Sequence, residues 1–290
     1  MTERSDTTFH LPRTCTEIGE HQSLPLDAFR AVDSYVLLGD PGSGKTRALE
    51  KEALESAGLF ISARDFLTLE PRDEWKSQTL FIDGLDETRA GDGDKRSALD
   101  RVRSRLDKLG RPKFRLSCRE ADWLAGSDSE ALTKVSRSAS VTTLHIDPLT
   151  DDQIMDYLDH HLGRGKGAPF VAAAQKHNLE PLLCNPQTLG LLAKAMQGDR
   201  WPDSRASTYE LACERLAREE NKEHRAARGS SRPPLEAVLD AAGFVCATAL
   251  FSDTPHISFE NGRLDSLLLE LLTPPEPLPL VDVVASRLFT

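Results

Sequence analysis

The stretch that decides the fold is residues 35–46, which read YVLLGDPGSGKT. It opens on an apolar run that predicts a buried strand, and it ends in a loop that matches the pattern G-x-x-x-x-G-K-[ST]. That loop comprises Gly39, Asp40, Pro41, Gly42, Ser43, Gly44, Lys45 and Thr46. Residues 47–57 follow with helix formers and no helix breaker, so the pattern lies between a strand and a helix, the context that it requires.

The residue types in this loop suit the binding of a phosphate chain. Glycines let the backbone turn so that successive N–H groups point at an anion, and the dipole of the following helix favours negative charge at the same place. Lys45 supplies a cation for the β- and γ-phosphates, and the Thr46 hydroxyl is a ligand for Mg²⁺. We therefore expect ATP or GTP to bind here with Mg²⁺. A chance glycine turn is the alternative, which the strand and helix around the loop disfavour.

A second polar site is predicted where another apolar strand ends, in residues 80–87, which read LFIDGLDE. In a parallel sheet the carboxyl ends of the strands form the edge where ligands bind, and we expect the phosphate loop and Asp83 to end neighbouring strands. Asp83 is then a ligand for Mg²⁺, and Gly84 leaves space beside the phosphates. Asp86 and Glu87 are candidates to orient or deprotonate the attacking water. The alternative is an acidic surface turn.

A third strand end carries a cation, in residues 116–120, which read LSCRE. We expect Arg119 to contact the γ-phosphate and to respond to its loss. The alternative is a surface arginine paired with Glu120. Cys118 is predicted to be a buried packing residue, because no histidine lies near it in the sequence to activate a thiol.

The pattern of apolar segments predicts an α/β fold for the first half of the chain. Short strands at 35–38, 59–61, 79–82, 113–117 and 141–146 alternate with helices such as the amphipathic segment 95–109. This alternation indicates a mostly parallel sheet sandwiched by helices. We assign residues 31–149 to this P-loop NTPase core. Residues 1–30 are expected to be an irregular N-terminal segment.

The second half of the chain is predicted to change architecture after Pro148. Residues 150–230 are expected to form an all-α lid domain, which begins with a capping box between Thr150 and Gln153. Residues 231–290 are expected to form a winged-helix-like domain with a helix at 235–251, a strand at 256–259 and a leucine-rich helix at 264–272. The leucines at 264, 267, 268 and 271 have helical spacing and predict a core stripe. Because the last apolar segment has no polar finish, we expect this domain to be incomplete at residue 290.

Composition excludes several classes of protein. The chain has 290 residues and a formal net charge of −10, which argues against a protein that coats nucleic acid. No apolar run is long enough to span a membrane, and the N-terminus lacks the apolar stretch of a secretory signal. The 5 cysteines are scattered, which indicates reduced thiols rather than disulfides or a zinc site. We therefore expect a cytoplasmic protein.

Taken together, the segments GDPGSGKT, FIDGLDE and LSCRE resemble the NACHT branch of the STAND class of P-loop NTPases. The acidic strand is the most specific feature. Proteins of this family carry a small residue directly after the magnesium aspartate and acidic residues a few positions later, as Gly84, Asp86 and Glu87 do. The segments HIDPLT (145–150) and NPQTL (185–189), together with residues 207–221, also look like parts of the family's helical region. The resemblance covers about residues 30–290.

The resemblance implies a nucleotide-controlled switch. Members of this family hydrolyse slowly and alternate between a closed ADP form and an open ATP form that oligomerises. The same likeness implies that Pro186 lies against the adenine. Bacterial members are often sensors in signalling or antiviral defence, which implies an activating ligand and an effector that the sequence does not identify.

Three other functions are weighed against this switch. One is a nucleotide-binding scaffold that hydrolyses little and acts by binding a partner. Another is an ATPase coupled to a winged-helix DNA-binding regulator, which is disfavoured because acidic residues outnumber basic ones in residues 235–290. A metabolic kinase is weaker still, because no phosphoacceptor pocket can be recognised.

Overall fold

The computed structural model describes residues 9–91, 95–196, 201, 206–207, 210–211, 213–214, 233–252, 256–258, 266–268, 272–274 and 277–280. The chain divides into two compact units. The first comprises Met1–Ala173 with Glu180–Gly190, and the second comprises Ala174–Leu179 with Leu191–Thr290. Each unit is described by itself.

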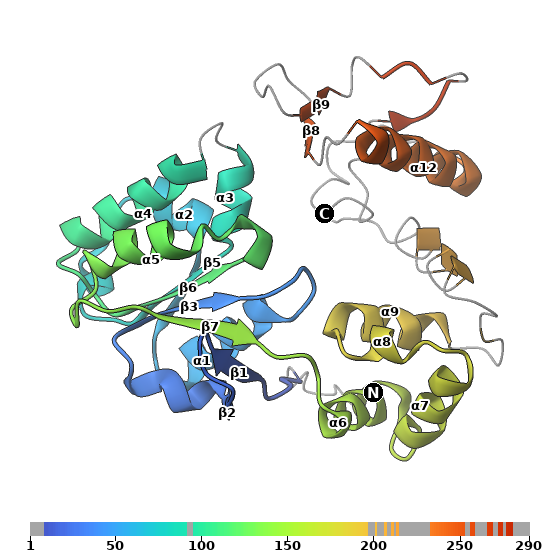
Figure 1. Cartoon of the computed structure of the whole chain (residues 1–290), viewed down its shortest axis with the longest axis horizontal. Coiled ribbons are helices and arrows are strands. Elements are labelled where there is room, and N and C mark those ends of the chain that lie inside the picture. The colour runs from blue at the N-terminus through green and yellow to red at the C-terminus, as the bar shows by residue number, and fades with distance from the viewer. Residues whose placement is uncertain are drawn as a thin grey trace, which may run out of the picture. The chain divides into compact units, whose positions relative to one another are not determined.

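A seven-stranded sheet forms the centre of the first unit (Figure 1). Its strands are β1 (Thr14–Glu17), β2 (Ser23–Pro25), β3 (Ser34–Leu38), β4 (Leu59–Ser62), β5 (Leu80–Asp83), β6 (Phe114–Cys118) and β7 (Thr142–Ile146). They lie in the order β2-β1-β7-β3-β6-β5-β4. The strands from β3 to β7 are parallel to one another, whereas β1 runs antiparallel to both β7 and β2. The predicted mostly parallel α/β fold is confirmed, and every predicted strand is present.

The prediction of an irregular segment over residues 1–30 was wrong for residues 14–17 and 23–30. Strands β1 and β2 lie there, followed by the 3₁₀ helix η1 (Leu26–Ala31). The strands are short and largely polar, so they lack a recognisable hydrophobic alternation. Tertiary pairing forms them: Cys15 pairs with Ile146 of β7 and is fully buried.

The expectation that the phosphate loop and Asp83 end neighbouring strands was also wrong. Strand β6 lies between β3 and β5, with Leu38 of β3 opposite Cys118, and Ile82 of β5 opposite Leu116. Strand order depends on where each crossover helix returns the chain, and hydrophobic pattern does not encode this. The consequence for the site is that the end of β6 lies between the phosphate loop and the acidic residues.

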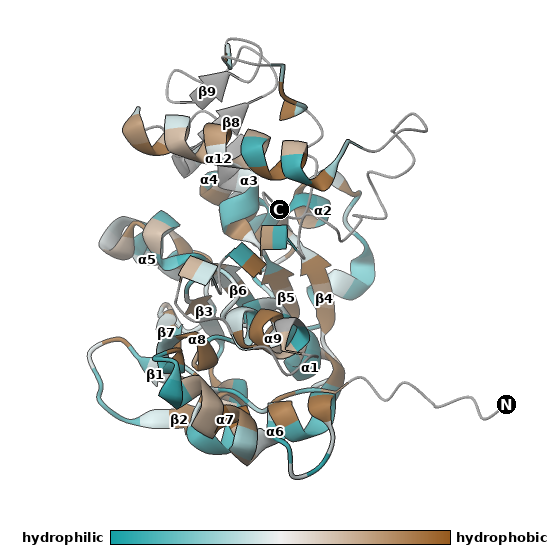
Figure 2. Ribbon diagram, turned by 90° about the vertical axis from the view of Figure 1, so that its right-hand side faces the viewer, coloured by the Kyte–Doolittle hydropathy of each residue, from teal (hydrophilic) through white to brown (hydrophobic). Residues whose placement is uncertain are grey.

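Alternating residues of the parallel strands pack against helices on both faces of the sheet. On one face, Tyr35, Leu37 and Phe81 pack with α1 (Lys45–Glu55) and η1. On the other face, residues such as Val36, Leu38 and Ile82 pack with α2 (Ala63–Thr68), α3 (Leu85–Gly91), α4 (Lys95–Lys108) and α5 (Ala125–Thr133). Short 3₁₀ helices η2 (Asp73–Lys76) and η3 (Glu120–Asp122) complete the connections. The apolar character of β4 and β5 is visible in Figure 2.

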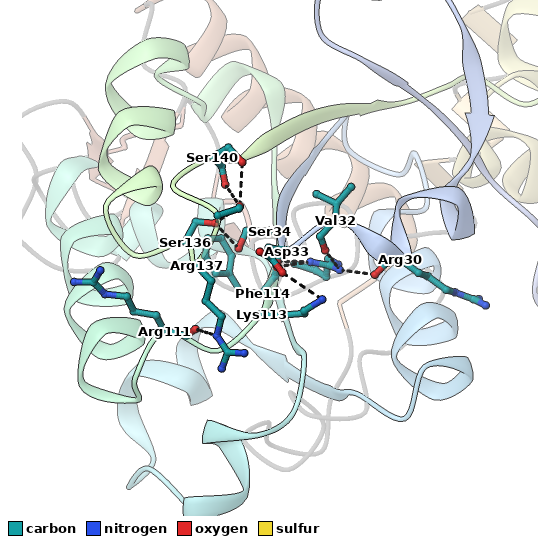
Figure 3. Close-up of polar contacts among 12 residues, drawn as sticks. Arg30, Val32, Asp33, Ser34, Arg111, Lys113, Phe114, Ser136, Arg137 and Ser140 are labelled. Atoms are coloured by element: carbon teal, nitrogen blue, oxygen red, sulfur yellow. Dashed lines mark hydrogen bonds and ion pairs between the residues drawn. The ribbon is translucent and has the colours of Figure 1, made fainter.

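Polar contacts join the residues around the amino ends of β3 and β6 (Figure 3). The Arg115 guanidinium is buried and donates hydrogen bonds to the carbonyl oxygens of Asp33 (2.8 Å) and Val32 (2.5 Å). The Ser136 hydroxyl donates to the Ser34 hydroxyl at 3.2 Å. The polar groups at this end of the sheet therefore satisfy one another's hydrogen bonds.

Helices follow β7, as predicted. They are α6 (Asp151–Leu162), α7 (Gly167–Lys176), α8 (Glu180–Leu183) and α9 (Pro186–Ala195). The predicted capping box is confirmed, because the Gln153 N–H donates to the Thr150 hydroxyl and the Thr150 N–H donates to the Gln153 side chain. The lid domain boundaries at 150 and 230 remain predictions.

The described part of the second unit contains α12 (Leu235–Phe251), β8 (His256–Ser258) and β9 (Ser266–Leu268). The two strands pair in parallel. The predicted leucine-rich helix at 264–272 was therefore wrong at 266–268, and the leucines at 264 and 271 lie outside the described residues. A short run of leucines is compatible with either period, and pairing with β8 decides for a strand. The winged-helix assignment remains a prediction. Within the described ranges, no helix is both long and apolar enough to cross a bilayer.

Candidate functional site

The phosphate loop runs from the end of β3 to the first turn of α1, so the predicted strand–loop–helix context is present. Gly42 has φ +72° and Gly44, the residue that caps α1, has φ +91°. Residues with a side chain rarely adopt this left-handed conformation, which explains glycine at both positions. The turn presents the amino end of an 11-residue helix at the carboxyl edge of the sheet.

The Lys45 side chain folds back over the loop. Its ammonium donates hydrogen bonds to the carbonyl oxygens of Gly39 (2.7 Å) and Asp40 (3.0 Å). Burial lowers the pKa of Lys45, and the nearby negative charges of Asp86 and Asp83 oppose this lowering. A cation in this position is poorly hydrated, so an arriving phosphate would interact with it strongly.

Asp83 is brought together with Thr46, as the sequence predicts. The Thr46 hydroxyl donates to Asp83 Oδ2 at 2.8 Å. Ser117, a residue of β6 that sequence reasoning missed, donates from its hydroxyl to Asp83 Oδ1 at 2.5 Å and accepts the Gly84 N–H at 2.8 Å. Ser117 is 1% exposed. The signal that could have found it is a serine directly before Cys118, at the carboxyl end of a strand.

The oxygen atoms of Thr46 and Asp83 fit a magnesium ion. Mg²⁺ prefers hard oxygen ligands, and it is usually bound by one or two carboxylates together with substrate phosphates and water rather than by a protein cage. Within the part of the chain that the structure describes, no group of three or more His, Cys, Asp or Glu is arranged to hold a metal.

Arg119 and Asp86 meet at the end of β6. Arg119 Nε lies 2.8 Å from Asp86 Oδ2, and the Arg119 backbone N–H donates to Asp86 Oδ1 at 3.2 Å. The Asp86 side chain is 8% exposed, whereas that of Arg119 is 49% exposed. Glu120, the alternative partner considered for Arg119, instead has its carboxylate 3.3 Å from His145 Nε2.

Glu87 lies against the glycine that follows Asp83. Gly84 has φ +79°, and a Cβ atom there would be 3.2 Å from the Glu87 carboxyl carbon. The pKa of Glu87 is raised by burial and by the charges of Asp86 and Asp83. A carboxyl group with a raised pKa is a stronger base once it is ionised, which suits proton transfer.

The start of α9 lies on the phosphate loop. The Asn185 amide donates to the Pro41 carbonyl oxygen at 3.1 Å, and the Gln187 N–H donates to the Gly42 carbonyl oxygen at 3.3 Å. A Cβ atom on Gly42 would lie 2.1 Å from Gln187 Oε1, so this close approach requires glycine. The NPQTL segment therefore contacts the phosphate loop directly.

Arg13 joins the N-terminal segment to the same loop. Its guanidinium donates to the Ser43 carbonyl oxygen at 2.5 Å and to the Asp147 carbonyl oxygen. The residue is 8% exposed. Sequence reasoning missed Arg13 because it lies far from any recognisable motif.

A cavity of about 490 Å³ opens beside the phosphate loop. Its wall includes Phe9, Arg13, Lys45, Tyr157, His161 and Pro186. His160 and His161, at the end of α6, are both exposed. His161 also lines the cavity, with its ring 4.3 Å from that of Tyr157. Sequence reasoning assigned no role to Phe9 and Tyr157, which line this wall. The family resemblance, in contrast, implied that Pro186 lies against the adenine.

Comparisons with known proteins assign no family to this chain. No family model matches the chain. A search of curated proteins found no match. Among solved structures, one from a study of the structural basis of katanin self-assembly is similar to this chain. The two have 16% sequence identity and a TM-score of 0.32, and the match covers 64% of this chain and 70% of the other.

Two further structures are of replication initiation proteins. A DNA replication initiation factor has 13% identity and a TM-score of 0.37, and the match covers 77% of this chain and 74% of that one. The replication initiator DnaA bound to AMPPCP and single-stranded DNA has 16% identity and a TM-score of 0.33. The match covers 76% of this chain and 65% of that one. All three TM-scores are below 0.5, so these likenesses assign no function to the chain.

Proposed function

We propose that this chain binds ATP or GTP with Mg²⁺ and hydrolyses it slowly, as a NACHT-type regulatory switch. The observation that carries the proposal is the hydrogen-bonded series Thr46–Asp83–Ser117, which joins the first turn of α1 to the carboxyl ends of β5 and β6. A hydroxyl and a carboxylate held 2.8 Å apart, next to a half-buried lysine, are what a magnesium-bound triphosphate requires.

The residues of the site would divide the work of hydrolysis. Thr46 and Asp83 would hold the magnesium ion, which neutralises charge on the β- and γ-phosphates. Glu87 would accept a proton from the attacking water. The water oxygen would bond to the γ-phosphorus as the bond between that phosphorus and the oxygen bridging to the β-phosphate breaks. Arg119, at the end of the strand between the phosphate loop and Asp83, would bind a γ-phosphate oxygen.

The cavity beside the loop would take the nucleoside. Its volume of about 490 Å³ falls in the range of small-molecule sites, and it is continuous with Gly44, Lys45 and Thr46. Aromatic rings such as that of Tyr157 stack favourably on adenine and on guanine. Pro186 lines the same cavity, in keeping with the proposed contact to the base.

The contacts of α9 with the phosphate loop suggest how nucleotide would control the chain. Asn185 and Gln187 bind the carbonyl oxygens of Pro41 and Gly42, so a loop that rearranges around a triphosphate would change these contacts. Only a difference in contacts between the ADP and ATP forms can shift the equilibrium, and a full switch requires roughly 5 kcal/mol. We further propose that the ATP form oligomerises. Size-exclusion chromatography with ADP and with a non-hydrolysable ATP analogue tests this, and identical elution would contradict it.

Lys45→Ala tests nucleotide binding. Isothermal titration calorimetry with ATP should show binding weakened roughly ten- to a hundredfold, because a charge-assisted contact to the phosphates is lost. Lys51→Ala is the matched control. Lys51 lies on the same helix with its ammonium 3.8 Å from Glu55, so this variant should bind ATP as tightly as the unmodified chain. If Lys45→Ala binds ATP as tightly as the unmodified chain, the proposal fails.

A nucleotide-binding scaffold with little hydrolysis is the second candidate. The back-folded Lys45 ammonium favours it, because the residue must leave two carbonyl partners before it can serve catalysis. Phosphate release by the unmodified chain and by Glu87→Gln separates the two functions. A switch that hydrolyses should lose phosphate release in the variant while it keeps ATP binding, whereas a scaffold should show the same low release in both.

A further inference from the structure

The contact between Asp86 and Arg119 has the geometry of an orienting pair. Asp86 uses both carboxylate oxygens on the same residue, one for the guanidinium Nε and one for the backbone N–H. Two contacts to one residue fix both the position of the arginine backbone and the direction in which its side chain leaves it. A single contact to a flexible arginine would not restrict it in this way.

The burial of the two partners is unequal, and this distinguishes the pair from an ordinary surface ion pair. The Asp86 side chain is 8% exposed and the Arg119 side chain 49% exposed. An exposed pair contributes little because solvent screens both charges, whereas a buried carboxylate strongly favours keeping its cation. The half-exposed guanidinium is therefore anchored from its buried side.

The same geometry leaves Asp86 poorly placed to activate water. A general base needs an oxygen lone pair directed at the water, whereas Asp86 Oδ1 accepts the Arg119 backbone N–H and Asp86 Oδ2 forms the ion pair with Arg119 Nε at 2.8 Å. Glu87 has no such contact among the described residues, and it lies beside Gly84 at the end of the magnesium-binding strand.

We propose that Asp86 is a positioning residue that orients Arg119 toward the γ-phosphate, and that Glu87 alone acts on the attacking water. This inference rests on the proposed function. The ion pair uses Nε, so Nη1 and Nη2 remain for a phosphate oxygen while Asp86 stays bound. Asp86 and Arg119 then act as one unit in distinguishing ATP from ADP.

A double-mutant cycle tests the inference. Dissociation constants for ATP and ADP, measured by calorimetry, give the preference for ATP of the unmodified chain, Asp86→Asn, Arg119→Gln and the double variant. We expect Asp86→Asn to lower the preference for ATP roughly tenfold, because an ion pair that directs the guanidinium is lost. In an Arg119→Gln background the same change should have no further effect, because residues that act as a unit are not additive.

Hydrolysis provides the contrast with Glu87. Glu87→Gln should reduce kcat to the same extent with Arg119 or with Gln at position 119, and it should leave the preference for ATP unchanged. Asp86→Asn should reduce kcat only when Arg119 is present. If Asp86→Asn lowers kcat equally in both backgrounds, or if its preference for ATP equals that of the unmodified chain, the positioning role is overturned.

Two further measurements keep the outcome decisive. If Asp86→Asn does not fold, Arg119→Lys replaces it, because a lysine keeps the charge but lacks Nε and should also lose about tenfold of the preference for ATP. An unchanged preference in Arg119→Lys overturns the inference. If the unmodified chain binds neither nucleotide, the proposed function fails and the inference fails with it, whereas additive effects in a chain that binds ATP remove the inference alone.

Discussion

Ser117→Ala tests a residue of the site to which the sequence analysis assigned no role. The serine hydroxyl donates to Asp83 Oδ1 at 2.5 Å and accepts the Gly84 N–H at 2.8 Å. Alanine has nearly the same shape, so the substitution removes both hydrogen bonds without creating a cavity. The effect therefore reports on the hydrogen bonds themselves.

The expected loss of stability follows from these two contacts. A hydrogen bond to a charged group contributes about 1.5–3 kcal/mol, and a buried N–H that loses its acceptor costs about 1–3 kcal/mol. Ser117 is 1% exposed, so water cannot easily replace it. Since the carboxylate keeps its contact with Thr46, we expect the free energy of unfolding to fall by about 2–4 kcal/mol.

Magnesium binding should fall as well. Groups that orient a metal ligand typically change metal affinity by 10-fold or more, so the Mg²⁺ concentration that supports half-maximal ATP binding should rise about tenfold. Urea denaturation followed by tryptophan fluorescence measures the stability, because Trp75 and Trp123 lie in the core of the first unit. Trp201→Phe in both proteins removes the remaining tryptophan signal.

Ser34→Ala is the matched control. Ser34 is as buried as Ser117, but it lies at the opposite end of the sheet and bonds to the neutral Ser136 hydroxyl at 3.2 Å (Figure 3). Its loss should cost about 1 kcal/mol and leave the Mg²⁺ dependence unchanged. The reasoning is refuted if Ser117→Ala costs no more than Ser34→Ala, or if it binds Mg²⁺ with ATP as the unmodified chain does.

Three further predictions concern the rest of the site. Because burial and the Asp86 and Asp83 charges raise the pKa of Glu87, the hydrolysis rate at saturating MgATP should rise with pH through an apparent pKa above that of an ordinary glutamate. Asp86→Asn should move this limb to lower pH, and a pH–rate profile that is unchanged would contradict the assignment. Gly42→Ala should lower the free energy of unfolding by about 1–2 kcal/mol, because φ is +72° and the new methyl group would collide with the first turn of α9. Gly126→Ala, where no heavy atom lies within 4 Å, should be neutral or stabilising in the same urea titration. Tyr157→Ala should weaken ATP and ADP binding by a similar factor, roughly tenfold, and leave inorganic tripolyphosphate binding unchanged in calorimetry. An equal loss for tripolyphosphate would show that the cavity does not take the nucleoside.

Local sequence was sufficient for the parts of the site that lie where a strand ends. The phosphate loop and Asp83 each follow an apolar run, Arg119 follows the mixed sequence of β6, and the carboxyl ends of parallel strands meet at one edge. The same reasoning failed for Phe9 and Tyr157, which reach the cavity from distant segments of the chain. Such contacts are made by tertiary packing, and no periodicity records them.

The failures of the fold prediction have related causes. Strand β1 is short and polar, and its pairing with β7 stabilises it more than its own pattern does. Residues 266–268 contain leucines that suit a helix or a strand equally well, and the partner strand β8 decides between them. Predictions therefore succeeded where the signal lay within one segment and failed where a second segment supplied it.

The position of β6 explains how the separate motifs come together at one edge of the sheet. Its pairing with β5 puts Ile82 opposite Leu116, so the next residues, Asp83 and Ser117, lie at the same level. On its other side Leu38 is opposite Cys118, immediately before the phosphate loop begins. A shift of one residue in either pairing would turn the side chains to the opposite face. The register of this single strand thus determines that the carboxylate, the serine, the phosphate loop and the arginine that follows Cys118 meet at one edge.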